Sequence, residues 1–295
     1  MRKQQKKMSA LDLEVQALLE QMRVALAFKD LSESTMDAYT KAVRLLSVHF
    51  GRSAVELDNA DLESYLLYLV NERKLAASTI NQKLFGMRFL YRDMLKRDYS
   101  VFEAFKNRKR RNQIPICLTH EEVKQVLAAV RSEEYRAALT LCYCCGLRVS
   151  EVCAVQIDHV MTGQGMLLVR GKGEKKRSMP LPVRALELLR ENYRESRPPR
   201  PWMFGNGNNS GPMNKRTVQK VLKSAVRSSG VNPAATVHTL RHSYATTLLR
   251  KGVDITTVQR WLGHKSVQTT MDYLHVIEQA AADNVKIVNE TMGDL

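Results

Sequence analysis

The chain has 295 residues and a formal net charge of +16, from 46 Lys and Arg against 30 Asp and Glu. This length favours two domains over one, and 44% hydrophobic residues supply material for a core in each. The charge favours a polyanion, most commonly nucleic acid, as partner; the sequence shows no apolar run of membrane-spanning length, so no membrane association is expected.

The N-terminal segment and the cysteines both indicate a cytoplasmic protein. "MRKQQKK" is basic like the start of a signal peptide, but acidic residues interrupt the segment that follows it. Four of the five cysteines crowd one stretch and Cys117 stands apart, which is not the pattern of a disulfide framework. No second Cys-x-x-Cys pair completes a zinc site, so buried thiols on an apolar helix are favoured over a metal site.

The first 104 residues carry apolar residues at helical spacing and predict a unit of four or five helices. Ser34, Asn59 and Ser78 are the predicted N-cap residues of three of these helices, because each precedes an apolar periodic run. Gly51 is predicted to end the second helix. We therefore expect a helical domain at 1–104.

A basic segment follows the helical unit and marks a domain boundary at 105–115. Its cations are Lys106, Arg108, Lys109, Arg110 and Arg111. Two interpretations stay open, a solvated linker and a linker that lies along a phosphate backbone, and the charge of the whole chain favours the second.

The remaining residues, 116–295, predict further helices and one hairpin. Thr119 and Glu122 form a capping box at a helix start. "GMLLVRGKGEKKRSMPLP" predicts two strands joined by a lysine-rich turn. The expected fold is mainly α, in two domains, with a small β-sheet or hairpin in the C-terminal domain.

Six polar residues in apolar surroundings of this second part form a set that suits phosphodiester cleavage without a metal. Two arginines can bind the non-bridging oxygens of a phosphate with paired hydrogen bonds, and imidazoles can exchange protons with it. A lysine on a hairpin turn can protonate a leaving oxygen, and a tyrosine can attack phosphorus where cations favour the phenolate. The six are Arg148, Lys172, His238, Arg241, His264 and Tyr273.

The same segments closely resemble the tyrosine site-specific recombinases, also called the phage integrase family. The resemblance rests on "GLRVSE", "GKGEKKR", "HTLRHSYATTLL" and "LGHKSVQTTMDYLH", in that order. "LSESTMDAYTKAVRLL" and "ASTINQKLFGMRFLYRDML" resemble the family's helical core-binding (SAM-like) domain, most like its Xer-type members. The resemblance therefore implies a DNA-binding domain at 1–104 and an α+β catalytic domain at 116–295.

The resemblance also implies a role for each of the six residues. Tyr273 is the nucleophile, which forms a 3′-phosphotyrosine and frees a 5′-hydroxyl. Arg148 and Arg241 bind the scissile phosphate, Lys172 is the general acid, His238 assists as acid or base, and His264 is a further phosphate ligand. Strand exchange passes through a Holliday junction, and the chemistry needs no metal, ATP or other cofactor.

Two neighbours of these residues have competing interpretations. His242 lies four residues from His238 and mimics a zinc pair, but the general-base Glu of a His-Glu-x-x-His motif is missing and no third ligand is evident. Glu151 lies one helical turn beyond Arg148, where it either orients that arginine or is an ordinary exposed acid. We expect both residues to support the catalytic set, with no metal.

Double-stranded DNA is the expected partner. Five polar residues lie on one predicted helix, whose polar face either contacts the major groove or lies in solvent: Ser78, Thr79, Asn81, Lys83 and Arg88. By the resemblance, the C-terminal segment at 275–292 couples protomers into a tetramer, with a dimer on each site. A second recombinase or accessory protein stays open as a partner. So do two other functions, an idle DNA-binding accessory factor and a topoisomerase-like enzyme.

Overall fold

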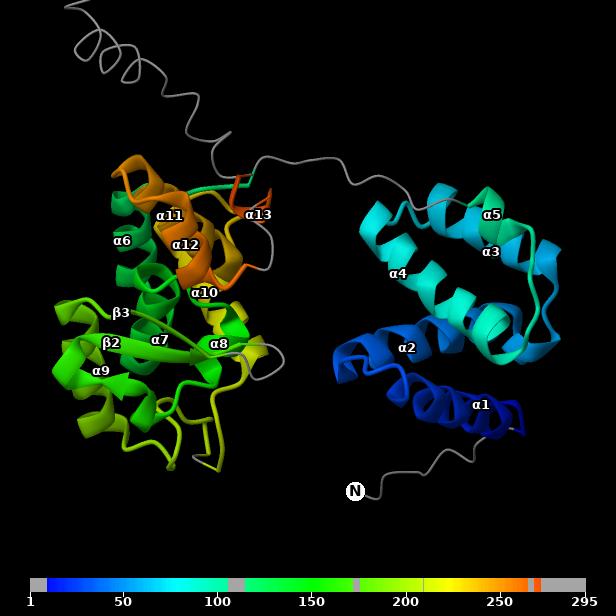
Figure 1. Ribbon diagram of the computed structural model, residues 1–295, viewed down its shortest axis with the longest axis horizontal. Coiled ribbons are helices and arrows are strands. Elements are labelled where there is room, and N and C mark those ends of the chain that lie inside the picture. The colour runs from blue at the N-terminus through cyan, green and yellow to red at the C-terminus, as the bar shows by residue number, and fades with distance from the viewer. Residues whose placement is uncertain (1–9, 106–114, 172–175, 209, 265–267, 272–295) are drawn as a thin grey trace, which may run out of the picture. The chain divides into compact units, whose positions relative to one another are not determined.

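The computed structural model describes residues 10–105, 115–171, 176–208, 210–264 and 268–271. Its contacts divide the chain into two units, Met1–Asn112 and Gln113–Leu295, and Figure 1 shows the helices of both. The division falls inside the basic segment predicted at 105–115. The five cations of that segment, Lys172, Tyr273 and the residues at 275–292 lie outside the described residues.

The first unit is helical, as its apolar spacing predicts. Buried leucines and methionines at helical intervals, such as Met22, Leu26, Leu46 and Leu84, pack into one core. The α4 helix continues without a break into a π-helical turn at Phe89–Met94. The helices are α1 (Ala10–Ala27), α2 (Glu33–Phe50), α3 (Asn59–Asn71), α4 (Ala77–Arg88) and the short α5 (Val101–Ala104).

Three predicted N-caps in this unit are wrong by one or two residues. The carboxylate of Asp58, not Asn59, caps α3, because it accepts from the backbone N–H of Asp61 at 2.9 Å. Asn59 instead accepts from the backbone N–H of Val101, a tertiary contact at 3.0 Å. Ser34 and Ser78 lie inside the first turns of α2 and α4, whose cap positions are Ser32 and Ala76.

A predicted helix end in the first unit is confirmed. Gly51 follows the last residue of α2 with a φ of 63°, the left-handed conformation that glycine adopts without strain. Nothing lies within 4 Å of the position of an added Cβ there. The glycine is therefore needed for its backbone conformation rather than for space.

The second unit packs helices around α7. The predicted Thr119 capping box is confirmed, with Glu122 as its partner. The helix α7 contacts α6, α8, α9, α10 and α11, and Figure 1 shows it in the middle of this unit. The helices are α6 (His120–Ala128), α7 (Glu133–Cys144), α8 (Val149–Cys153), α9 (Val183–Ser196), α10 (Lys215–Ser229), α11 (Val237–Arg250), α12 (Ile255–Leu262) and α13 (Gln268–Met271).

The predicted two-stranded hairpin is confirmed, and a third strand extends it into a small sheet. β2 (Met166–Arg170) pairs antiparallel with β3 (Lys176–Pro180), and the short β1 (Val160–Met161) pairs with the other edge of β2. A strand of two residues is too short to show a period in sequence. Along β3 the exposure alternates, so that Arg177 and Met179 share the inner face of the sheet.

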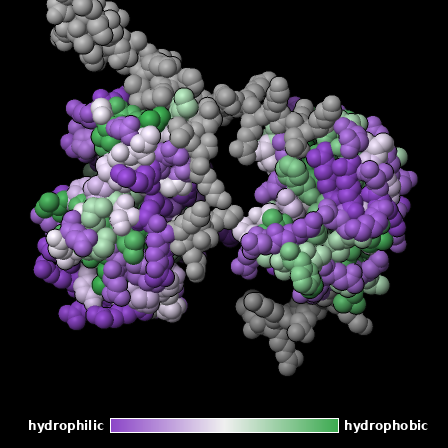
Figure 2. Space-filling view, in the orientation of Figure 1, coloured by the Kyte–Doolittle hydropathy of each residue, from purple (hydrophilic) through white to green (hydrophobic). Residues whose placement is uncertain are grey.

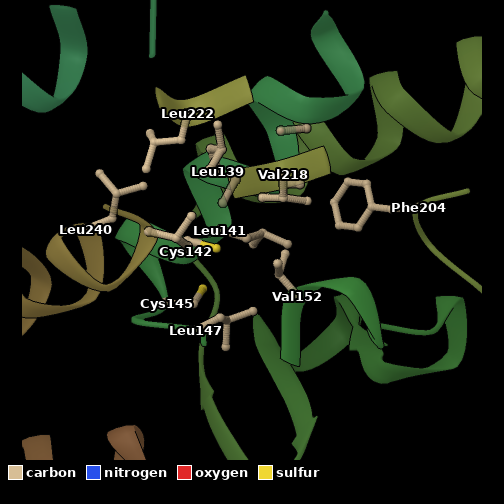
Figure 3. Packing of buried hydrophobic residues seen from close by; sticks show 14 of the residues in the cluster. Leu139, Leu141, Cys142, Cys145, Leu147, Val152, Phe204, Val218, Leu222 and Leu240 are labelled. Carbon is tan, nitrogen blue, oxygen red and sulfur yellow. The ribbon is translucent and has the colours of Figure 1, made fainter. Parts of the chain in front are cut away.

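Three of the four cysteines at 142–153 lie in the apolar core, and Cys144 is half-buried at its edge. Cys142 and Cys145 are fully buried and Cys153 is 4% exposed. Figure 3 shows the first two among the side chains of Leu141 and Leu147. Burial raises the pKa of the Cys142 thiol well above its ordinary value. These three thiols are core residues, as the sequence predicts.

The face of each unit that Figure 2 shows is largely polar. On the face that Figure 2 shows, hydrophilic residues cover much of each unit, with hydrophobic patches between them. Within the residues that the structure describes, no helix is both long and apolar enough to cross a membrane.

Candidate active site

The site begins at the turn between α7 and α8. Gly146 has a φ of 57°, and a Cβ there would lie 2.5 Å from the ring of Tyr244. The turn therefore needs glycine both for its backbone and for space. It places Arg148 at the N-cap of α8, where the Glu151 carboxylate accepts from the backbone N–H of Arg148 at 2.9 Å and from its Nη1 at 2.8 Å.

Glu151 is the centre of an arginine cluster. The residue is 5% exposed. Arg177 of β3 donates to both of its oxygens, at 2.9 and 2.8 Å, which is the paired geometry that favours arginine. Nη1 of Arg241 lies 3.7 Å from Oε2. One carboxylate thus lies against three guanidinium groups, from α8, β3 and α11.

The ionisation of Glu151 is set by these contacts. Burial by itself raises the pKa of the carboxyl, but the hydrogen bond and charge of Arg177, followed by Arg148, outweigh it and lower the pKa to about 2. Glu151 is therefore an anion at neutral pH. Three arginines and one carboxylate leave a net charge of about +2 at the site, and this positive charge suits a second anion such as a phosphodiester.

The C-terminal carbonyl groups of α12 hold the same arginines. Arg241, which is 2% exposed, donates from Nη2 to the Leu262 carbonyl at 2.6 Å and from Nη1 to the Gly146 carbonyl at 2.6 Å. Nη1 of Arg148 lies 3.4 Å from the Leu262 carbonyl, and Nε of Arg177 donates to the Trp261 carbonyl at 2.6 Å. Helix-terminal carbonyls lack partners within the helix and carry partial negative charge, so cations stabilise them.

Two histidines of α11 lie on one face of the helix. The ring centroids of His238 and His242 are 5.8 Å apart and the rings are nearly parallel. Burial, then Arg241 and Arg148, lower the pKa of His238. Burial, then His238 and Arg241, lower the pKa of His242 to about 4. Both imidazoles are neutral at pH 7 in the protein without DNA.

His264 follows the glycine that ends α12. Gly263 has a φ of 63°, and its carboxyl-side neighbour His264 has its Nδ1 2.9 Å from the hydroxyl of the buried Thr270. Burial, then Arg241 and Arg148, lower the pKa of His264 to about 3. The contact with Thr270 fixes the orientation of a neutral ring beside the arginines.

The structure brings together Arg148, Arg241, His238 and His264, with Glu151 and His242 beside them. Lys172 and Tyr273 lie outside the described residues. None of the described histidines, cysteines and carboxylates form a group of three that could hold a metal ion.

Sequence reasoning missed Arg177 and Thr270. A signal for Arg177 was present, because the alternation along β3 puts it on the face of the buried Met179 and opposite Val169 of β2. A basic residue on the inner face of a strand needs a buried anion. Thr270 carries no comparable signal.

The predicted DNA-binding helix has one correction. Ser78, Thr79, Asn81, Lys83 and Arg88 all lie on α4. Arg88, however, points into the protein, where it donates to the carbonyl groups of Phe102 and Phe105. These bonds tie α4 to α5 and to Phe105 directly after it, and they use the guanidinium that the prediction assigned to DNA.

Solved structures share this fold. XerH recombinase bound to the palindromic difH substrate is 21% identical, with a TM-score of 0.67 over 97% of this chain and 91% of that one. A lambda integrase tetramer bound to a Holliday junction is 20% identical, with a TM-score of 0.70 over 88% of this chain and 76% of that one. The fold is that of the two-domain tyrosine recombinases.

Sequence comparison shows the family. Residues 117–280 match the phage integrase family, and residues 18–101 match the phage integrase N-terminal SAM-like domain. A tyrosine recombinase of Thermosipho africanus is 34% identical over 86% of this chain and 93% of its own length. An integrase/recombinase of Escherichia coli is 32% identical over 90% of this chain and 91% of its own length.

The chain belongs to the phage integrase family and is a Xer-like tyrosine recombinase. Members of this class break and rejoin DNA. The reaction is site-specific recombination through a Holliday junction. The resemblance stated from the motifs is thereby confirmed for family, fold and reaction class.

Proposed function

We propose that the arginine cluster around Glu151 binds the scissile phosphate of DNA and that Tyr273 attacks it. The observation that carries this proposal is that Arg148 and Arg241 share one carboxylate and one helix end. Three neutral imidazoles lie near these arginines. The side chain of Arg148 is 35% exposed, so it can reach a ligand while it stays bonded to Glu151.

The proposed reaction conserves bond energy. The phenolate oxygen of Tyr273 attacks phosphorus, the bond to the 5′-oxygen breaks, and Lys172 supplies the proton that this oxygen takes up. The products are a 3′-phosphotyrosine and a 5′-hydroxyl, and the reverse attack by a 5′-hydroxyl rejoins the strand. Arg148 and Arg241 neutralise the charge that builds up on the non-bridging oxygens.

Neutral histidines suit the two directions of this reaction. A neutral imidazole has one nitrogen that donates and one that accepts, so His238 can take a proton from the tyrosine or return it. The low pKa of His264 makes it a neutral hydrogen-bond partner for the phosphate. His242 stacks on His238 and supports its orientation.

For the helical unit we propose DNA binding through a basic hollow between α2, the end of α3 and α4. The hollow has a volume of about 630 Å³, and Lys41, Arg73, Thr79 and Lys83 line it. Burial, then Lys41 and Arg73, lower the pKa of Lys83, so cations converge there and a phosphate would relieve their repulsion. Ser78 is exposed on the adjacent face of α4.

We also propose that residues 1–104 form the core-binding domain, that 105–115 form a basic linker along the DNA and that 116–295 form the catalytic domain. The proposed assembly is a tetramer coupled through 275–292, with a dimer on each site. The solved lambda integrase tetramer on a Holliday junction supports such an assembly. Because its substrate is DNA, the enzyme is proposed to act in the cytoplasm.

Covalent capture tests the catalytic proposal. The protein is incubated in EDTA with sheared DNA of its source organism and denatured, and the DNA that stays attached is sequenced. We expect attached DNA with the unmodified protein and with Tyr244→Phe, but not with Tyr273→Phe. Tyr244 is the matched control because it lies near the arginines, and burial raises its pKa.

Each other outcome has a definite meaning. Equal attachment with Tyr273→Phe would refute Tyr273 as the nucleophile. Native DNA binding without any attachment would favour an accessory factor or a missing partner recombinase. Attached DNA that reseals in place, without joining a second duplex, would favour the topoisomerase-like alternative.

A further inference from the structure

We propose that Arg177 is a positioning residue that holds the Glu151 carboxylate in place and thereby sets the orientation of the two phosphate-binding arginines. The inference rests on the proposed function of Arg148 and Arg241. It assigns to β3 a role in the chemistry that none of the six motif residues carries.

The first argument is the geometry of the Arg177–Glu151 pair. Each carboxylate oxygen of Glu151 accepts from a different nitrogen of Arg177, at 2.9 and 2.8 Å. Such a pair fixes both the position and the plane of the carboxylate. Arg148 also contacts both oxygens, with its side chain at 2.8 Å and its backbone N–H at 2.9 Å, and Arg241 lies at 3.7 Å. Arg177 is therefore the group from another element, β3, that holds both oxygens of the carboxylate against which the other two arginines lie.

The second argument is the bond from Arg177 to α12. Its Nε donates to the Trp261 carbonyl at 2.6 Å. The next carbonyl, of Leu262, accepts from Arg241 at 2.6 Å. The position of a Cβ on Gly263 would lie 3.2 Å from the Arg177 side chain, so the helix end packs directly on the guanidinium. One side chain thus joins the hairpin, α8 and the end of α12.

The third argument separates Arg177 from a direct phosphate ligand. Nε, Nη1 and Nη2 each donate to the protein, to Trp261 or to Glu151, and the side chain is 11% exposed. Arg148, in comparison, is 35% exposed. Exposure alone does not decide the matter, because Arg241 is only 2% exposed. The paired bonds from Nη1 and Nη2 assign Arg177 to the Glu151 carboxylate, through which it acts on the phosphate.

The test is the single-turnover cleavage rate of Arg177→Lys on a nicked oligonucleotide duplex that carries the site found by covalent capture. Lysine keeps the charge but cannot make the paired bonds. We expect cleavage to slow by about 100-fold, the effect of a misplacement of about 1 Å, with the Kd for the duplex changed less than about twofold. Arg170→Lys, at the exposed end of β2 in the same hairpin, should cleave at the unmodified rate.

Two modified duplexes show through which group Arg177 acts. A methylphosphonate at the scissile position lacks one negative charge, so it needs the arginines less, and the defect of Arg177→Lys should shrink by about tenfold or more. A 5′-bridging phosphorothioate has a leaving thiolate that needs no proton from Lys172. The defect should remain there, because the proposed action of Arg177 is on the arginines.

Contrary results overturn the inference. Cleavage by Arg177→Lys at the unmodified rate, an equal defect on all three duplexes, or a defect that the phosphorothioate alone removes would each do so. If the variant fails to bind DNA or unfolds below the assay temperature, Arg177→Gln replaces it, because its amide can donate to one oxygen of Glu151 while Arg148 still neutralises the carboxylate. Arg177→Gln must then show the same recovery on the methylphosphonate. Absence of cleavage by the unmodified protein would instead overturn the proposed function, and this inference with it.

Discussion

Replacement of Glu151 by glutamine should destabilise the catalytic unit by several kcal/mol. The pKa of this carboxyl falls from its ordinary 4.5 to about 2 in the folded protein. At about 1.36 kcal/mol for each pKa unit, the ionised carboxylate contributes about 3 kcal/mol at pH 7. Loss of one partner from a buried ion pair has a similar cost, about 3–5 kcal/mol. The pKa shift and the loss of the ion pair therefore give the same order of magnitude for the loss of stability.

The pH dependence follows from the same pKa values. Because the folded pKa is below the unfolded one, the stabilisation is complete above the unfolded value of 4.5 and is lost as the pH falls toward about 2. At pH 3 the folded carboxyl is still largely ionised and the unfolded one is protonated. The difference between the unmodified protein and Glu151→Gln should therefore shrink from about 3 kcal/mol at pH 7 to about 1.4 kcal/mol at pH 3.

Urea unfolding followed by tryptophan fluorescence measures this difference for the catalytic unit alone. Both tryptophans of the chain, Trp202 and Trp261, belong to that unit. Glu187→Gln is the matched control, since its ion pair with Arg184 is exposed and worth less than about 1 kcal/mol. A Glu151→Gln protein as stable as the unmodified one at pH 7, or a difference that does not narrow in acid, would refute the reasoning.

Three further predictions concern the turn, a histidine and the basic hollow. Gly146→Ala should lower the free energy of unfolding by more than about 2 kcal/mol in the same urea assay, because the added methyl group would lie 2.5 Å from Tyr244. Gly165→Ala is the control: it has a φ of 61° and open space, and should lower the free energy of unfolding by about 1–2 kcal/mol. Equal losses of stability would contradict the clash. His264, with a pKa of about 3, should show no imidazole titration by NMR between pH 5 and 8 in the protein without DNA. Since its folded pKa is depressed, the unit should lose stability as the pH falls below about 6.5, and less so in His264→Gln. Lys83→Met should weaken DNA binding and make the slope of log K for DNA against log salt concentration shallower by about 1. Lys29→Met is the control, because Lys29 lies in an exposed ion pair, and it should leave this slope unchanged.

Helices, hairpin and motif residues could be predicted because they depend on local spacing. Apolar residues at intervals of three and four predict helices in any context, and the alternation on both sides of a turn predicts β2 and β3. Arg148 and Glu151 lie three residues apart, so their contact follows from helical geometry. Local rules fail where a tertiary contact competes, as when Asn59 bonds to Val101 instead of capping its own helix.

The order of the six motif residues was sufficient for the family, and the roles of Lys172 and Tyr273 stay predictions from it. The sequence by itself determined which chemical groups are present and on which local elements they lie. Only the tertiary structure decided that Arg177, 26 residues from Glu151, and Arg241, 95 residues from Gly146, meet at one helix end. The physical reason is that pKa values and buried ion pairs depend on which groups share a desolvated space, and spacing along the chain does not specify that space.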